Sequence, residues 1–188
     1  MTIIIGLGNP GEKFNHTPHN MGVLAIDLFA KENSFPDFSF SKKSNALTSE
    51  QNEVLLVKPQ TFMNESGKSV KELTKNQPLP ILIIVHDDID MPLGKIKIVK
   101  DSGAGGHKGV ASIIQHLGSQ DFIRVKIGVC PSTGKPEAVE EFVIKKLPPA
   151  EQEVALKAAE KASKALTFFL EHGPEKTMNE FNYRPLAK

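Results

Sequence analysis

A run of three isoleucines, Ile3 to Ile5, leads directly into a glycine-rich turn, Gly6-Leu7-Gly8-Asn9-Pro10-Gly11. β-branched side chains favour strands, and an uninterrupted apolar run fits a strand that is covered on both faces. The glycines permit backbone angles that other residues avoid, and they let a ligand approach the bare backbone. The junction therefore predicts a buried strand in an open α/β sheet, with a ligand site where the strand ends.

The same turn matches the G-x-G-x-x-G pattern of dinucleotide-binding folds. That fingerprint requires a helix to begin within the turn, followed by a second strand with an acidic residue about twenty residues on. Here residues 20–31 have the length and apolar spacing of a helix, so Asp27 and Glu32 fall in it or just after it. The spacing therefore argues against a nicotinamide cofactor.

Apolar runs and turn residues divide the rest of the chain into alternating strands and helices. We predict strands at 2–6, 45–49, 54–58, 81–86, 95–99 and 124–129, and helices at 20–31, 66–75, 109–117 and 150–172. The strands 45–49 and 54–58 are expected to form a hairpin, and Gly173-Pro174 to end the long helix, with a turn or two at 175–181. The pattern predicts an α/β fold: a single domain over residues 1–188, built as a three-layer sandwich with a mixed, mostly parallel twisted sheet flanked by helices.

Cysteine content and hydropathy bound the cellular setting. The chain has one cysteine, Cys130, which excludes an internal disulfide, and its first residues lack the charged and apolar segments of a signal peptide. No apolar run approaches the roughly 18 residues of a membrane span. We therefore expect a soluble cytoplasmic protein without a membrane partner.

Charge is unevenly distributed although the net charge is only +1. Residues 94–126 include six basic and two acidic residues, which gives that segment a net charge of +4. Such a local basic field suits a polyanion, although a solvated lysine surface would have the same composition.

Polar residues follow a second buried strand. Ile81 to Val85 run straight into His86 and Asp87, and His19 lies only ten residues after Asn9. If the two strands are parallel neighbours, these side chains share one edge of the sheet. An Asp that accepts a hydrogen bond from one imidazole nitrogen fixes the tautomer and raises the basicity of the other nitrogen, so a His-Asp pair can activate water.

A metal site is the main chemical alternative. Nitrogen and oxygen ligands are available from the set His16, His19, His86, Asp87, Asp88 and Asp90. Asp88 and Asp90 could equally brace the turn that follows them. Nucleophilic catalysis is disfavoured, because no serine lies in a G-x-S-x-G motif and Cys130 ends a strand before a proline.

Two further segments offer groups to a substrate. The loop 103–109 precedes a helix, and its backbone N–H groups can either stabilise an anion or belong to a plain connector. Asn64 can both donate and accept, so it can hold a substrate amide, or it can cap the helix that follows.

Five segments together resemble the bacterial-type peptidyl-tRNA hydrolases, in order and spacing: 6–11, 19–20, 58–67, 86–94 and 105–109. The resemblance covers nearly the whole chain and extends to residues 178–182. It implies a monomeric esterase that needs no metal or cofactor and that releases the peptide from peptidyl-tRNA. Two alternative functions remain open. The chain could be an RNA-binding protein without hydrolytic activity, as some relatives of this family are, or a metal-dependent hydrolase.

The resemblance also implies roles for individual residues. His19 would be the general base and Asp87 its orienting partner, with the substrate bound by Asn9, Phe14, Asn20, Phe62, Asn64, His107 and Lys108. The tRNA phosphates would meet Arg124 and Lys126, while Lys97 or Lys100 would replace a basic residue of the family that is Val99 here.

Three departures from the family pattern surround the expected site. Phe14 stands in place of a tyrosine, Pro18 in place of an arginine, and Lys108 in place of an asparagine. Lys108 can turn outward and add to the phosphate-binding face, or point inward as a charge on the developing oxyanion. We expect the outward orientation, because a cation near His19 would disfavour the imidazolium that forms when the base takes a proton.

Overall fold

The computed structural model describes residues 1–75 and 80–182. Its centre is a seven-stranded sheet in the order β2-β3-β4-β1-β5-β7-β6. The strands are β1 Thr2–Gly6, β2 Ser39–Ser41, β3 Ala46–Gln51, β4 Val54–Pro59, β5 Ile81–Pro92, β6 Ile96–Lys100 and β7 Ile123–Cys130. The central strands β4, β1, β5 and β7 are parallel, and the outer pairs β2–β3, β3–β4 and β6–β7 are antiparallel. The predicted mixed sheet of an α/β fold is confirmed.

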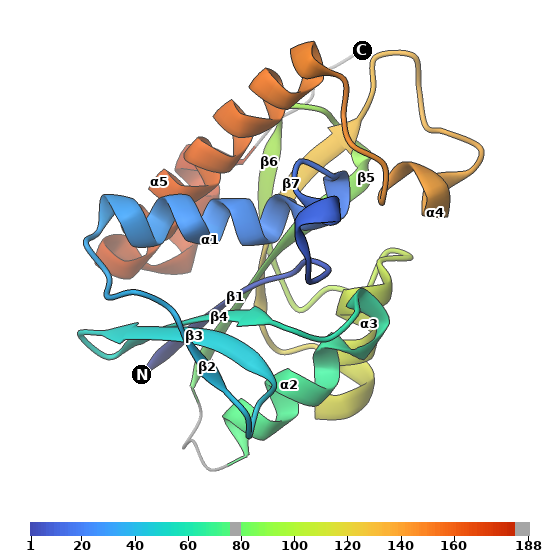
Figure 1. Cartoon of the computed structure of the whole chain (residues 1–188). Coiled ribbons are helices and arrows are strands. Elements are labelled where there is room, and N and C mark those ends of the chain that lie inside the picture. The colour runs from blue at the N-terminus through green and yellow to red at the C-terminus, as the bar shows by residue number, and fades with distance from the viewer. Residues whose placement is uncertain (76–79, 183–188) are drawn as a thin grey trace.

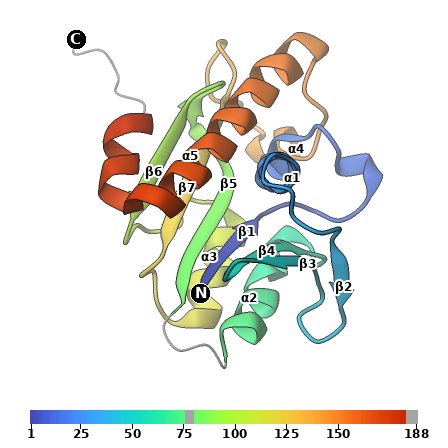
Figure 2. The ribbon, with the colours of Figure 1, turned by 90° about the vertical axis from the view of Figure 1, so that its left-hand side faces the viewer.

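Helices cover both faces of this sheet, as the two views in Figures 1 and 2 show. They are α1 Met21–Glu32, α2 Ser66–Thr74, α3 Lys108–Leu117, α4 Val139–Phe142 and α5 Pro149–Phe181. Helices α1 and α5 lie on one face, and α2 and α3 on the other. None of the helices within the described residues combines the length and apolar character that a membrane crossing requires.

The isoleucine run serves both cores. Ile4 packs in the core on the α1 and α5 side, with Phe29 among its members. Ile3 and Ile5 belong to the other core, together with Ile113 of α3. Their complete burial explains why this strand shows no alternation of apolar and polar residues.

Close packing at Gly22 sets the position of α1. A Cβ atom at Gly22 would lie 2.2 Å from the Val85 carbonyl oxygen and 2.6 Å from the Leu7 nitrogen. Only glycine therefore lets the start of α1 rest against the ends of β1 and β5. This contact brings the residues just before α1, including His19, to the carboxyl edge of the sheet.

The structure corrects several predicted bounds. Strand β5 continues to Pro92 instead of stopping at residue 86, so Asp87 lies within a strand. Strand β2 and helix α4 were not predicted. The predicted break at Gly173-Pro174 is confirmed: Gly173 has a non-helical backbone with φ of 79°, and a second helical segment of α5 continues to Phe181.

Two other local predictions had different outcomes. The β3–β4 hairpin is confirmed, with Asn52 and Glu53 at positive φ in its turn. The spacing of Val154, Ala158, Ala162, Ala165 and Phe169 predicts one buried apolar stripe on the long helix. The last four residues are buried, but Val154 is 41% exposed and Ala155 is buried in its place.

Candidate active site

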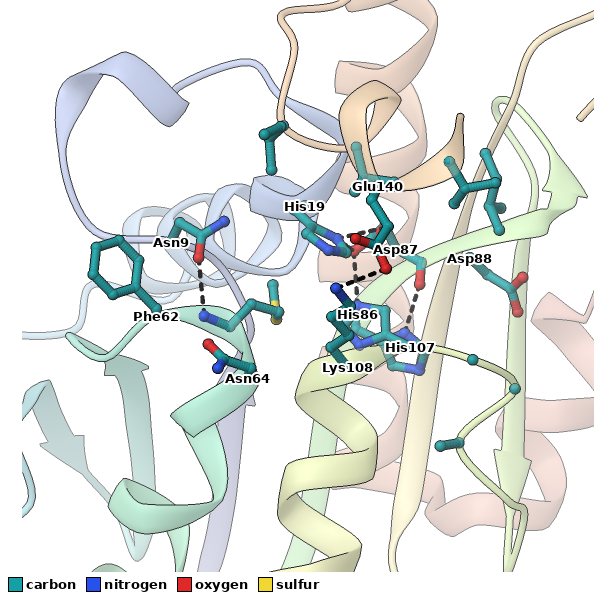
Figure 3. A pocket seen from close by; sticks show the side chains of 18 of the residues that line it. Asn9, His19, Phe62, Asn64, His86, Asp87, Asp88, His107, Lys108 and Glu140 are labelled. Atoms are coloured by element: carbon teal, nitrogen blue, oxygen red, sulfur yellow. Dashed lines mark hydrogen bonds and ion pairs between the residues drawn. The ribbon is translucent and has the colours of Figure 1, made fainter. Parts of the chain in front are cut away.

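A cleft of about 680 Å³ lies at the carboxyl ends of β1 and β5 and is closed by the loop before α3 and by α4 (Figure 3). It brings together most of the site residues predicted from the sequence: Asn9, Phe14, His19, Phe62, Asn64, Asp87, His107 and Lys108. Asn20 and the four basic residues predicted to contact phosphate do not line it.

One buried carboxylate lies between two imidazole rings. His19, in the 3-10 turn Pro18–Asn20, places its Nδ1 3.0 Å from Asp87 Oδ1 and 3.1 Å from Oδ2. His107 Nε2 lies 2.9 Å from the same Oδ1. The Asp87 side chain is only 2% exposed, whereas that of His19 is 11% exposed toward the cleft.

The surroundings of these groups define their protonation. Burial alone would raise the pKa of Asp87, but the charges and hydrogen bonds of His107 and His19 outweigh it and hold that pKa well below its usual range. Asp87 is therefore an ionised acceptor, so both imidazoles donate to it. His19 donates through Nδ1, which leaves its Nε2 as the free basic nitrogen.

His107 lines the cleft, where the resemblance implies a substrate contact, and it is also held by two hydrogen bonds within the protein. Its Nδ1 accepts a 3.3 Å hydrogen bond from the Val110 N–H and thereby caps α3. Its Nε2–H donates to Asp87. Because both ring nitrogens are engaged within the protein, His107 positions the carboxylate and couples it to α3.

His86 is the third histidine of the cluster and is 1% exposed. Its Nδ1 lies 2.6 Å from the Asp87 carbonyl oxygen, and its ring lies edge-on to His107 at 4.6 Å. Burial, reinforced by the neighbouring His107, holds the pKa of His86 well below 6.5. His86 is therefore a neutral packing partner behind the His19–Asp87 pair.

Asn9 is held by two hydrogen bonds to its backbone and one to its side-chain amide. The Asn20 side chain accepts from Asn9 N at 2.9 Å and donates to Asn9 O at 3.0 Å. Asn9 Oδ1 accepts from Met63 N at 2.9 Å. Within the described residues Asn9 Nδ2 has no partner, so it is available to the cleft, whereas Asn20 acts on Asn9 and not on the cleft.

The walls of the cleft combine free polar and apolar groups. Asn64 is exposed and is not a helix cap, because Phe62 and Glu65 occupy the cap positions of the two helical segments here. Phe62 is 57% exposed at the rim. Figure 3 shows Asn9, Phe62 and Asn64 on the side of the cleft opposite His107.

Helix α4 supplies a wall that sequence reasoning missed. Val139, Glu140, Val143 and Ile144 line the cleft. The apolar spacing of Val139, Phe142 and Val143 is the signal that could have indicated this short helix.

Comparison with known proteins places this geometry in a family. The profile described as peptidyl-tRNA hydrolase matches residues 3–188. The chain belongs to the peptidyl-tRNA hydrolase family.

Relatives of similar length support the same assignment. Peptidyl-tRNA hydrolase of Lactococcus lactis subsp. lactis is 42% identical over 96% of this chain and 98% of its own length. That of Thermodesulfovibrio yellowstonii is 41% identical over 97% of this chain and 99% of its own length. The crystal structure of peptidyl-tRNA hydrolase from Acinetobacter baumannii superposes with a TM-score of 0.89, at 30% identity over 98% of this chain and 96% of that one.

The four basic residues predicted to contact tRNA phosphate differ in their position on the sheet and in their exposure. His86, Lys126 and Lys97 occupy one row across β5, β7 and β6. Lys97 is exposed, and Lys126 forms an ion pair with Asp88. Because β6 and β5 are separated by β7, the Lys97 backbone lies two strand spacings, about 10 Å, from the His86 backbone.

The other two basic residues do not join this row. Arg124 is 2% exposed and donates to the Gly103 carbonyl oxygen at 2.8 Å, so the predicted phosphate contact is wrong for this residue, which braces the glycine loop instead. Lys100 lies opposite Ile123, farther from the cleft, and pairs with Asp121 at 3.8 Å.

Proposed function

We propose that this protein hydrolyses the ester of peptidyl-tRNA with His19 as the general base and Asp87 as its orienting partner. The activity is that of the family to which the chain belongs. The observation that carries the residue roles is the His19 Nδ1 hydrogen bond to Asp87, which leaves Nε2 free beside the cleft. A water on Nε2 would lose its proton as it attacks the ester carbonyl, and the tRNA 3′ oxygen would leave with a proton returned by the imidazolium.

The amide groups of the cleft would hold the acyl part of the substrate. Two hydrogen bonds fix the Asn9 backbone and a third fixes its side-chain Oδ1, so Asn9 Nδ2 can donate to the developing oxyanion without reorganising. Asn64 can both donate to and accept from a peptide group. The exposed ring of Phe62 and that of Phe14 offer apolar contact on either side.

We assign the phosphate contact to Lys97 and Lys126. They lie side by side on β6 and β7, in the segment with a net charge of +4. The whole chain would act as one catalytic domain and as a monomer in the cytoplasm, where its substrate arises during translation.

Purified protein and labelled peptidyl-tRNA provide the test. His19→Ala should lower turnover by about 10²–10⁴-fold and leave tRNA binding nearly intact. His172→Ala is the matched control, because His172 is exposed on α5 away from the cleft and should leave the rate unchanged. More than half of normal turnover in the His19 variant would reject the base assignment.

Two further measurements separate the alternatives. Asp87→Asn should cost less than His19→Ala, since an amide oxygen still accepts one imidazole N–H; a greater loss would make Asp87 the base. Turnover should survive exhaustive EDTA treatment. Loss with EDTA and recovery with added metal would identify a metal-dependent hydrolase, and tRNA binding without any hydrolysis would identify a binding protein.

A further inference from the structure

The cluster around Asp87 has the composition and spacing of an incomplete metal site. One nitrogen each from His19 and His107 and one Asp87 oxygen lie within 4.8 Å of one another. The three residues come from different elements, namely the turn before α1, strand β5 and the cap of α3. The reaction proposed above needs no metal there, so this donor set is left without an assigned ligand.

The distances suit zinc in particular. Asp87 Oδ1 lies 3.0 Å from His19 Nδ1 and 2.9 Å from His107 Nε2. Ligand atoms at about 2.0–2.1 Å from a tetrahedral zinc ion are about 3.3 Å apart, so each of these two contacts needs to open by only a few tenths of an ångström. The two imidazole nitrogens, which lie within 4.8 Å of each other, need to reach the same separation. Two imidazoles and a carboxylate are ligands that zinc accepts, whereas magnesium prefers oxygen alone.

The geometry points to a reversible inhibitory Zn²⁺ site formed by His19, Asp87 and His107. Its fourth ligand would be a water from the cleft, which His19 and His107 both line. His86 stays outside the set, because its Nδ1 is held by the Asp87 carbonyl oxygen.

Zinc binding shifts protons between the ring nitrogens of the two histidines without any net uptake or release of protons. At His19 the proton shifts from Nδ1 to Nε2 as Nδ1 binds the ion. At His107 it shifts from Nε2 to Nδ1, which gives up the 3.3 Å hydrogen bond from Val110 N. Asp87 remains a carboxylate and exchanges two hydrogen bonds for one bond to zinc.

Inhibition follows from the new tautomer of His19. A protonated Nε2 donates a hydrogen bond and cannot take a proton from water, so the bound ion removes the base. This consequence rests on the proposed role of His19, whereas zinc binding itself does not.

Calorimetric titration of the intact protein with zinc chloride tests the binding. We expect one Zn²⁺ per chain, with affinity lowered at least about tenfold in both His107→Gln and Asp87→Asn because each removes one ligand. His172→Gln is the matched control: His172 Nε2 lies 3.6 Å from a Glu171 oxygen in an exposed pair, the arrangement typical of an adventitious surface site. Binding that survives in His107→Gln, or that disappears in His172→Gln, overturns the proposal.

Hydrolysis of a small peptidyl-nucleoside ester tests the inhibition. This substrate contains no tRNA, so zinc binding to tRNA phosphates cannot affect the measured rate. Zinc should stop turnover, EDTA should restore it, and equal concentrations of Mg²⁺ should have no effect. If zinc binds at the cluster but the ester is never cleaved, the proposed function fails and the site stands. If the ester is cleaved equally fast with saturating zinc, the inhibitory role is rejected.

Nitrogen NMR of the parent protein covers the case in which the variants do not fold. Zinc should shift the ring nitrogens of His19 and His107 and leave those of His172 in place. Shifts confined to His172 or His16 would overturn the proposal.

Discussion

Lys108 Nζ lies 2.8 Å from Glu140 Oε1, so an ion pair between α3 and α4 spans the cleft (Figure 3). The Lys108 side chain therefore turns toward α4. Both side chains are largely exposed, at 53% and 78%. An exposed pair of this kind contributes about 0.2–1 kcal/mol, which makes it a weak link across the opening.

Lys108→Asn should leave cleavage of a small peptidyl ester unchanged or slightly faster, since it removes a link that substrate entry must displace. It should modestly weaken binding of whole tRNA, because a cation is lost. Lys145→Asn is the control, as Lys145 forms an exposed pair with Glu141 at 2.9 Å. A loss of more than about tenfold on the small ester, or ~1.4 kcal/mol, would place Lys108 inside the catalytic machinery.

Lys126→Ala should weaken tRNA binding and lower its salt slope by about one unit, because one phosphate contact is lost. Asp88→Asn should have the opposite effect on binding, since Asp88 competes with phosphate for Lys126. Filter binding at several salt concentrations measures both. Lys100→Ala is the control and should change the binding less, because Lys100 lies farther along β6 beside Asp121. Equal losses on tRNA and on the small ester would assign Lys126 to catalysis or folding.

The buried His86 should make the protein less stable in mild acid. Its pKa in the folded state lies well below 6.5, so below pH 6.5 the unfolded chain takes up a proton that the folded protein excludes. The free energy of unfolding should therefore fall with pH below 6.5, by up to about 1.4 kcal/mol per unit from this group.

His86→Asn keeps a donor for the Asp87 carbonyl oxygen and removes the titration. Urea unfolding between pH 5 and 8 should show a shallower slope for this variant, and the two curves should run parallel above pH 7. An unchanged slope would mean that His86 is protonated in the folded protein.

Gly22→Ala should destabilise the fold by about 3 kcal/mol, the upper end for overpacking, because the added carbon meets backbone atoms that cannot move aside. Its nearest neighbour would be the Val85 carbonyl oxygen at 2.2 Å. Gly103→Ala is the control: its Cβ would meet no atom closer than 3.9 Å, so stability should be unchanged or slightly higher. Equal urea midpoints for the two variants would contradict this account of how α1 is positioned.

Local sequence patterns predict much of the architecture. The isoleucine run predicts a strand buried on both faces, and Ile3, Ile4 and Ile5 indeed divide between two cores. The hairpin between β3 and β4 follows from two short apolar runs separated by turn residues. Apolar periodicity reports burial, so it predicts elements well, but it does not report where a strand carrying polar residues ends. Strand β5 therefore extends past the predicted bound, through Asp87.

The sequence by itself determined that His19, Asn9 and Asp87 meet at one edge of an α/β sheet, because parallel strands bring their carboxyl ends together. Tertiary structure alone decided the partners. His107 donates to Asp87, Arg124 is buried against Gly103, and Lys108 pairs with Glu140, all through contacts between residues 20 to 32 positions apart. Such contacts leave no periodic signal in the chain. Their geometry is fixed only when the helices pack on the sheet and each buried polar group finds the nearest group that can satisfy it.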